Sequence, residues 1–266
     1  MARELVRNLE NIAFDIAKGN VPGHFSLNKF GRNTEIDSGV IADIWDGGHT
    51  VSSGGTSLIW VAPTQARTHT IASTDANDTS GGSGARTVRI SGLTSWSTAE
   101  VTEDVTMNTG APPTTSNSYV IIYRMQVLTK GATNVNIGII TATATTDATI
   151  TARINIGEGQ TQMAIYGIPS IQTMYIGRFY GNVNRSAGAA GALDVSLRVN
   201  SEPEAELTNF VVKHTFGVIT TGTSALTINY EAFKIIPGPA IIKVQGVSTA
   251  NDLDVSAGFD AFIVNN

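Results

Sequence analysis

The sequence predicts a mainly β protein, an antiparallel β-sandwich or jelly roll with one short N-terminal amphipathic helix. Apolar residues repeat with a helical period only near the N-terminus, and from about residue 50 onward they alternate with polar residues. Clusters of Gly, Asn, Ser and Pro separate the alternating runs at close spacing. Charged residues make up only 15% of the 266 residues, so Thr, Ser and Asn must supply much of the polar surface.

The expected helix covers residues 3–18, and its apolar stripe consists of Leu5, Leu9, Ile12 and Ile16. Lys18 suits the negative end of the helix, Gly19 suits the left-handed position that follows it, and Pro22 prevents continuation. A stripe of this kind must be covered, either by the chain's own sheet or by a neighbouring subunit.

Residues 28–48 (NKFGRNTEIDSGVIADIWDGG) follow neither the helical nor the strand period, which predicts an ordered loop. The glycines permit tight turns, Asp37 and Asp43 can accept main-chain hydrogen bonds, and Trp45 can fill an apolar gap. We expect this loop to fix the N-terminal arm to the β body. The residues expected to serve packing and assembly are Leu5, Leu9, Ile12, Ile16, Phe30, Arg32 and Trp45.

Four later runs alternate strictly, which predicts strands with one buried face and one solvated face, packed as a sandwich. Their apolar positions are Val88 and Ile90; Ile150, Ala152, Ile154 and Ile156; Leu193, Val195, Leu197 and Val199; and Leu226, Ile228, Tyr230 and Ala232. Residues 118–128 are apolar on both faces, which indicates a central strand or one covered by a partner. The expected organisation is an arm and loop (1–48) followed by segments 49–140 and 141–266, as two β domains or two halves of one.

The composition excludes several classes of function. A net charge of −5 without a basic run gives no footprint for nucleic acid. The absence of cysteine excludes disulfides, thiolate metal sites and cysteine nucleophiles. No apolar run approaches the roughly 18 residues of a membrane span, and Glu4, Glu10 and Asp15 interrupt any signal-peptide core.

No motif in the sequence predicts catalysis, and no cofactor is expected. The four histidines (His24, His49, His69 and His214) lack the spacing of a metal site, and no G-x-S-x-G elbow occurs. The loop 81–86 (GGSGAR) precedes a strand rather than a helix, so it indicates a hairpin loop. Two loops rich in Asp and Asn, 75–78 and 251–254, are typical of turns, with calcium binding as the alternative. Trp96 suits strand-edge packing or, alternatively, a glycan-binding platform.

The order of several segments resembles a family of tailed-phage virion structural proteins, common in marine and cyanobacterial phages. These segments are AKGNVPGHFSLNKFGRNTEIDSGVIADIWDGG, GARTVRISGL, VTEDVTMNTG, GEGQTQMAIYGIPS and the C-terminal VSAGFDAFIVNN. The most specific parts are residues 28–32 with 43–48, and residues 256–260.

The resemblance implies a non-enzymatic structural protein of the virion, assembled in the host cytoplasm. It favours a capsid decoration (cement) protein that binds the phage major capsid protein and associates with itself, as a homotrimer. The alternative placement is a tail, baseplate or head-fibre protein, with a host-glycan-binding role. A separate hypothesis, from the residues alone, is a carbohydrate-binding module with Trp96 and the two Asp- and Asn-rich loops as its site. No nucleic-acid or membrane partner is expected.

Overall fold

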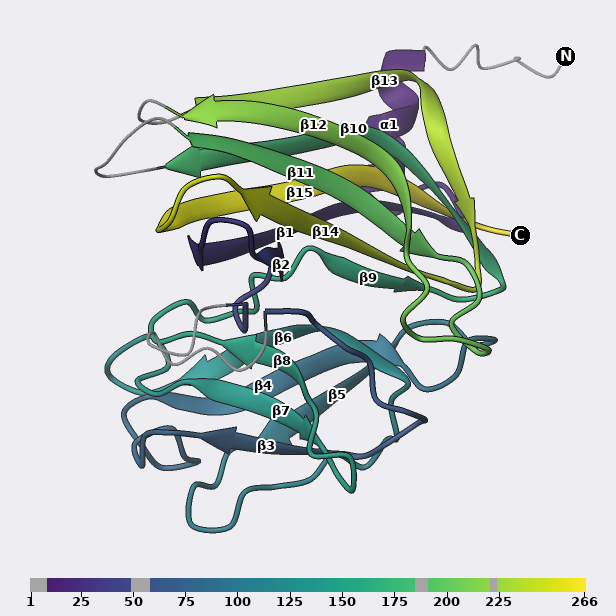
Figure 1. Ribbon diagram of the computed structural model, residues 1–266. Helices are drawn as coiled ribbons and strands as arrows, with labels where there is room; N and C mark the ends of the chain where they lie inside the picture. Colours follow the sequence, from purple (N-terminus) through teal and green to yellow (C-terminus); the bar gives the residue numbers. More distant parts are fainter. Residues whose placement is uncertain (1–8, 49–57, 185–190, 221–223) are drawn as a thin grey trace, which may run out of the picture.

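The computed structural model describes residues 9–48, 58–184, 191–220 and 224–266, and within these ranges the chain is mainly antiparallel β structure (Figure 1). It has one helix, α1 (Leu9–Ala17), and strands β1 to β15, whose ladders all run antiparallel. The predicted fold class, antiparallel sheets with one short N-terminal helix, is confirmed.

Two sheets form what we call the sandwich lobe, in the upper half of Figure 1. In order across the first sheet lie β1 (His24–Ile36), β15 (Leu253–Asn265), β10 (Gln172–Asn184) and β13 (Ser224–Pro237). The second contains β12 (Val211–Thr220), β11 (Gly191–Asn200), β14 (Ala240–Ser248) and β2 (Ile41–Asp43), with β9 (Ile165–Ile168) also paired to β14.

The two sheets pack face to face through alternate residues. Leu193, Val195, Leu197 and Val199 of β11 are all buried, as their alternation predicts. From the first sheet, the Phe179 ring meets the Phe216 ring of the second at a centroid distance of 4.8 Å. Phe259 of β15 is fully buried in the same core.

Two three-stranded sheets form the insert lobe, in the lower half of Figure 1. One contains β3 (His69–Ser73), β7 (Ile140–Ala144) and β8 (Ile150–Ile154), and the other contains β5 (Val101–Thr106), β4 (Ala85–Leu93) and β6 (Ile121–Lys130). Val88 and Ile90 of β4 are buried as predicted. β6 is buried on both faces at Ile121, Ile122 and Tyr123, and β8 and β9 of the same chain contact it, whereas Arg124 is exposed.

The insert lobe interrupts the sandwich lobe between β2 and β9, so the expected division at residues 140/141 does not follow the sheets. Strand β7 begins at Ile140 and pairs with β3 across Ile71 and Ala142, so that boundary would cut through one sheet. The threonine-rich composition of residues 141–148 reflects a tight hairpin between β7 and β8, in which Thr146 and Ala148 have positive φ angles.

Residues 28–48 are not a loop over most of their length, which corrects the prediction. Residues 24–36 form the long strand β1, which pairs with β15 from His24↔Val264 to Ile36↔Leu253. The strand period is hidden because its inward face carries the buried polar residues Lys29 and Asn33, not apolar ones.

The end of α1 follows its sequence signals. Gly19 has φ +75°, and the Lys18 N–H donates to the Phe14 oxygen at 3.0 Å. Of the predicted helix, residues 3–8 lie outside the described residues. α1 packs against β1, so its described part covers the chain's own sheet.

Two other strands depart from the predicted alternation. β8 is buried on both faces, including Thr151 and Arg153, whereas Ile156 is 63% exposed because the strand ends at Ile154. β13 lies at the end of its sheet, so Leu226 and Ala232 are exposed although they occupy apolar positions of the pattern.

Candidate functional site

The predicted assembly residues do not form one cluster. Leu5 lies outside the described residues, as does the side chain of Leu9. Ile12 is half-buried and Ile16 is buried on α1. Trp45 lies in the interior, away from the surface that carries Phe30 and Arg32. Their common role in assembly therefore stays a prediction.

Phe30 and Arg32 lie on the outer face of β1, where the structure brings two distant sequence segments together. Residues 28–32 and 256–260 pair in register, with Asn28 opposite Asp260 and Arg32 opposite Ser256. Arg32 binds Asp254 through two hydrogen bonds, from Nε to Oδ1 at 2.9 Å and from Nη2 to Oδ2 at 2.5 Å. Two of the three segments most specific for the sequence resemblance are thus adjacent in one sheet, whereas the third, residues 43–48, is buried.

A row of polar side chains continues across this outer face. Asn28 donates to Asp260 Oδ1 at 2.5 Å and to the Tyr180 hydroxyl at 3.0 Å. Arg178 lies 3.3 Å from Asp260 Oδ2, and its Nε donates to Asn229 Oδ1 at 3.1 Å. Exposed pairs such as these contribute little stability, but they order the polar side chains of this face.

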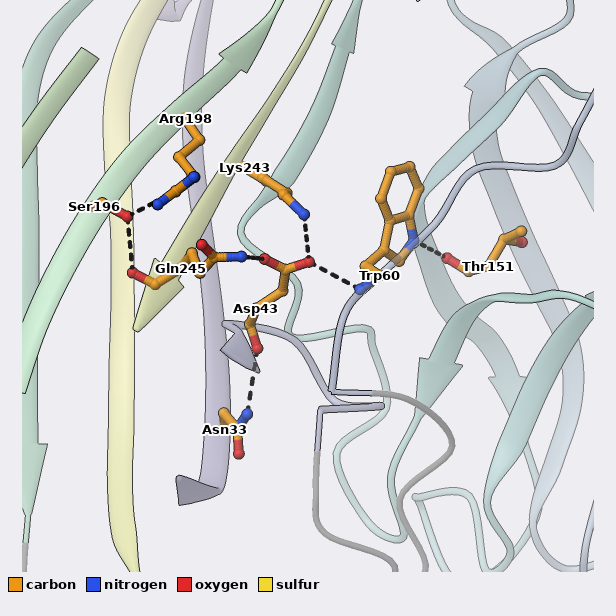
Figure 2. Close-up of polar contacts among 8 residues, drawn as sticks. All are labelled: Asn33, Asp43, Trp60, Thr151, Ser196, Arg198, Lys243 and Gln245. Carbon is orange, nitrogen blue, oxygen red and sulfur yellow. Dashed lines mark hydrogen bonds and ion pairs between the residues drawn. The ribbon is translucent and has the colours of Figure 1, made fainter. Parts of the chain in front are cut away.

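The two lobes are joined by a buried polar cluster, which we call the interlobe clasp: Asp43, Trp60, Lys243, Gln245 and Asn33 (Figure 2). Asp43 accepts hydrogen bonds from Lys243 Nζ at 2.7 Å, Gln245 Nε2 at 2.9 Å and the Trp60 main-chain N–H at 2.8 Å. The Asp43 and Lys243 side chains are 0% and 4% exposed, so this ion pair is almost completely shielded from solvent.

Trp60 connects the clasp to the insert lobe, because its indole Nε1 donates to the Thr151 oxygen of β8 at 2.8 Å. On the sandwich side, the Gln245 main-chain oxygen accepts from Ser196 Oγ, which in turn accepts from Arg198 Nε. Burial raises the pKa of Asp43, and Lys243, the Trp60 N–H and Gln245 oppose this rise by stabilising the carboxylate.

Residues 45–48 form the second part of the joint. Trp45 is fully buried, and its main chain forms an isolated antiparallel β-bridge with Met163. A Cβ atom at Gly47 would lie 2.2 Å from the Trp45 indole, so only glycine fits there. Asn33 donates to the main-chain oxygens of Gly48 at 2.5 Å and Asp43 at 3.2 Å. This stretch is therefore held against β1 and Met163, and its expected role in fixing the N-terminal arm stays a prediction.

Asp46 is the second buried carboxyl group of the joint. It accepts from the Gln162 main-chain N–H at 2.7 Å and from Asn155 Nδ2 at 3.4 Å. Burial raises the pKa of Asp46 to about 8, with Glu158 acting in the same direction and Arg153 opposing it. The group is therefore mostly protonated near neutral pH.

The acidic loops considered for calcium have partners within the protein. Asp78 is fully buried, and its carboxylate accepts hydrogen bonds from the main-chain N–H groups of Ala85, Ile137 and Gly138 and from Ser73 Oγ. These hydrogen bonds explain an aspartate at this position by its role in fixing the loops. Asp254 is paired with Arg32. Within the described ranges, no group of three or more His, Asp and Glu side chains is placed to hold a metal ion.

Sequence reasoning identified Asp43 as an acceptor but missed Lys29, Lys243 and Gln245. A signal was present, because Lys243 interrupts the apolar run AIIKV of β14. A lysine at such a position either reaches solvent or meets a buried acid, and here it meets Asp43.

The fold and the joint define a two-lobed antiparallel β protein. No family model and no curated protein matches the sequence. Among solved structures, the chain is similar to that of infectious bursal disease virus Gt strain, with a TM-score of 0.27 and 11% identity over 92% of this chain and 74% of the other. It is also similar to infectious bursal virus derived T=1 particles (TM-score 0.26, 10% identity, 92% and 70% covered) and to the VP2 subviral particle of that virus (0.24, 12%, 92% and 73%). This level of likeness carries no argument about function.

No helix of the described part is long and apolar enough to cross a membrane.

Proposed function

We propose that this chain is a non-enzymatic structural protein of a bacteriophage virion, and specifically a capsid decoration protein that binds the shell of major capsid protein. The proposal rests on the sequence resemblance together with one observation, a pair of edge strands with exposed apolar side chains that the described chain leaves uncovered.

These edge strands are β12 and β13, which are consecutive in the chain, belong to different sheets and lie near each other at the top of the sandwich lobe (Figure 1). Each is the last strand of its sheet, so each has a free edge among the described strands. Large apolar side chains are exposed along both strands: Val211, Val212, Ile219, Leu226, Phe233 and Ile235. They are about half of the exposed large apolar residues of the described chain.

Two free strand edges with exposed apolar side chains favour association, because free strand edges pair with other chains. Closed self-association supplies that cover, and burial of these side chains would contribute about 25 cal/mol per Å² of apolar area, less the entropy of association. We therefore propose that the edge strands β12 and β13 form the contact between copies in a homotrimer. The shell is bound by another surface, for which the outer face of β1 with Phe30 and Arg32 is our candidate.

The first test is the oligomeric state of the purified chain by size-exclusion chromatography with light scattering. The unmodified chain should be a trimer, and the double variant Ile219→Glu/Ile235→Glu should be a monomer. Ile156→Glu is the matched control, because Ile156 is 63% exposed against 73% for Ile219 but lies in the insert lobe. A monomeric unmodified chain would contradict this contact through the edge strands β12 and β13.

The second test is the copy number in purified virions on a denaturing gel. Hundreds of copies per particle support a place on the shell. A dozen copies or fewer would instead support a tail, baseplate or head-fibre position.

A further inference from the structure

A cavity of about 600 Å³ lies between the free edge of β1 and the insert lobe. Residues 25–30 all line it. Consecutive side chains of a strand point to opposite faces, so a cavity lined by six consecutive residues must lie along the edge of the strand. The opposite wall comes from Ser91, Glu100, Tyr123 and Arg124 of the insert lobe, with Tyr166 of β9. Its volume is in the range of small-molecule sites, roughly 300–1,000 Å³.

The cavity contains a buried amine. Lys29 is 7% exposed, and its Nζ donates to the main-chain oxygen of Tyr123. No ion pair joins Lys29 to an Asp or Glu of the described ranges. A buried ammonium without a counter-ion is costly, so this site favours an anion that reaches Nζ from the cavity.

The remaining lining groups restrict the kind of anion. Glu100 accepts from the Tyr123 hydroxyl at 2.6 Å, and its carboxylate offsets one of the two positive charges of the lining, Lys29 and Arg124, so the remaining charge matches a monoanion better than a dianion such as a phosphate monoester. Its carboxylate, with the nearby side chains of Ser91 and Gln160, can instead bind hydroxyl groups. The Tyr123 and Tyr166 rings, 4.4 Å apart, give an apolar surface beside these polar groups.

We propose that this cavity binds a carboxylated pyranose, a uronic or sialic acid residue, with its carboxylate on the Lys29 ammonium and its hydroxyl groups on Glu100. The sugar ring packs against the tyrosine pair. One carboxylate, several hydroxyl groups and a partly apolar ring are the combination that these lining groups complement. This inference is independent of the position of the protein in a virion, because it concerns the single chain.

The test is titration calorimetry of the full chain at pH 6 with the methyl glycosides of glucuronic acid and N-acetylneuraminic acid, and with neutral methyl glucoside. At least one acid should bind, and the tighter of the two identifies the source of the ligand. Lys29→Met should weaken that binding by at least about tenfold. This variant keeps the length of the side chain and removes a buried charge, so it should fold. Lys130→Met is the control, because Lys130 is an exposed lysine at the end of β6 that does not line the cavity.

Binding should also depend on pH. Burial lowers the pKa of Lys29 to about 7, Arg124 acts in the same direction and Glu100 opposes it. The other titratable groups facing Lys29 are Tyr123 and Tyr166, whose pKa values burial raises, so they stay protonated here. If only the ammonium binds the acid, the affinity should fall about tenfold from pH 6 to pH 8. Equal binding of methyl glucoside, unchanged binding by Lys29→Met, or no binding of either acid at 10 mM would overturn the proposal.

Discussion

Removal of Lys243 tests the interlobe clasp most directly. In Lys243→Met, Asp43 keeps its hydrogen bonds from Gln245 and Trp60 but loses the ammonium at 2.7 Å. Methionine preserves the packing against the Phe210 ring, which lies 4.3 Å from Nζ. The measured loss should therefore report the unpaired carboxylate. Breaking a buried ion pair in this way costs about 3–5 kcal/mol.

Protonation of Asp43 sets a ceiling on that cost. In the variant, the folded-state pKa of Asp43 lies above the unfolded value of about 3.9, so the folded protein holds a proton that the unfolded chain releases. Stability is then lost as pH rises above about 4. At about 1.4 kcal/mol per pH unit, neutralising the carboxyl costs at most about 4 kcal/mol at pH 7 and about 1.5 kcal/mol at pH 5.

The assay is urea unfolding of the unmodified chain and the variant at both pH values. We expect a loss of about 3 kcal/mol at pH 7 and less than about 1.5 kcal/mol at pH 5. The double variant Asp43→Asn/Lys243→Met should recover most of the loss and show no such pH dependence. Arg89→Met is the control, because Arg89 forms an exposed pair with Asp104 and should change stability little at either pH. An equal loss at pH 5 and pH 7 would refute the reasoning, because it would indicate lost packing.

Three further predictions concern the joint and the N-terminus. Asp46→Asn should raise stability at pH 8 and leave it nearly unchanged at pH 4. The folded-state pKa of Asp46, about 8, lies above the unfolded value, so the unmodified chain loses stability as pH rises between about 4 and 8. Urea midpoints that change in parallel with pH for the two proteins would count against this. Trp45→Ala should cost about 3–5 kcal/mol by urea unfolding, since Trp45 is fully buried, and a loss below about 0.5 kcal/mol would contradict a packing role. Deletion of residues 1–20 should leave the strand signal in circular dichroism intact, because β1 begins at His24. It should reduce incorporation of the protein into virus particles. An unchanged number of copies per particle would refute a role for the arm.

The antiparallel sandwich could be predicted because its core strands alternate. In β11, every second residue from Leu193 to Val199 is buried between two sheets, and the alternation of apolar with polar residues in the sequence predicts this burial. The end of α1 was predictable for a similar reason, because Gly19 alone accounts for the left-handed position.

The joint between the lobes could not be predicted from sequence pattern. β1 places Lys29 and Asn33 inward, so a strand of 13 residues lacks the apolar alternation that marks a half-buried strand. The partners of the clasp are also distant along the chain, since Asp43 is 200 residues from Lys243 and 202 residues from Gln245. Local periodicity carries no information about such pairs.

The path of the chain at the joint has an evolutionary consequence. β2 and β9 lie along the same edge of β14, with Asp43 opposite Gln245 and Ile165 opposite Lys243. Between them, the Ala164 N–H donates to the Ile44 oxygen at 2.9 Å, so the departing and returning segments are direct neighbours. A segment whose two ends meet in this way can be lengthened, shortened or exchanged as a cassette without separating the strands of the host sandwich. The same sandwich is thereby suited to carry different insert lobes.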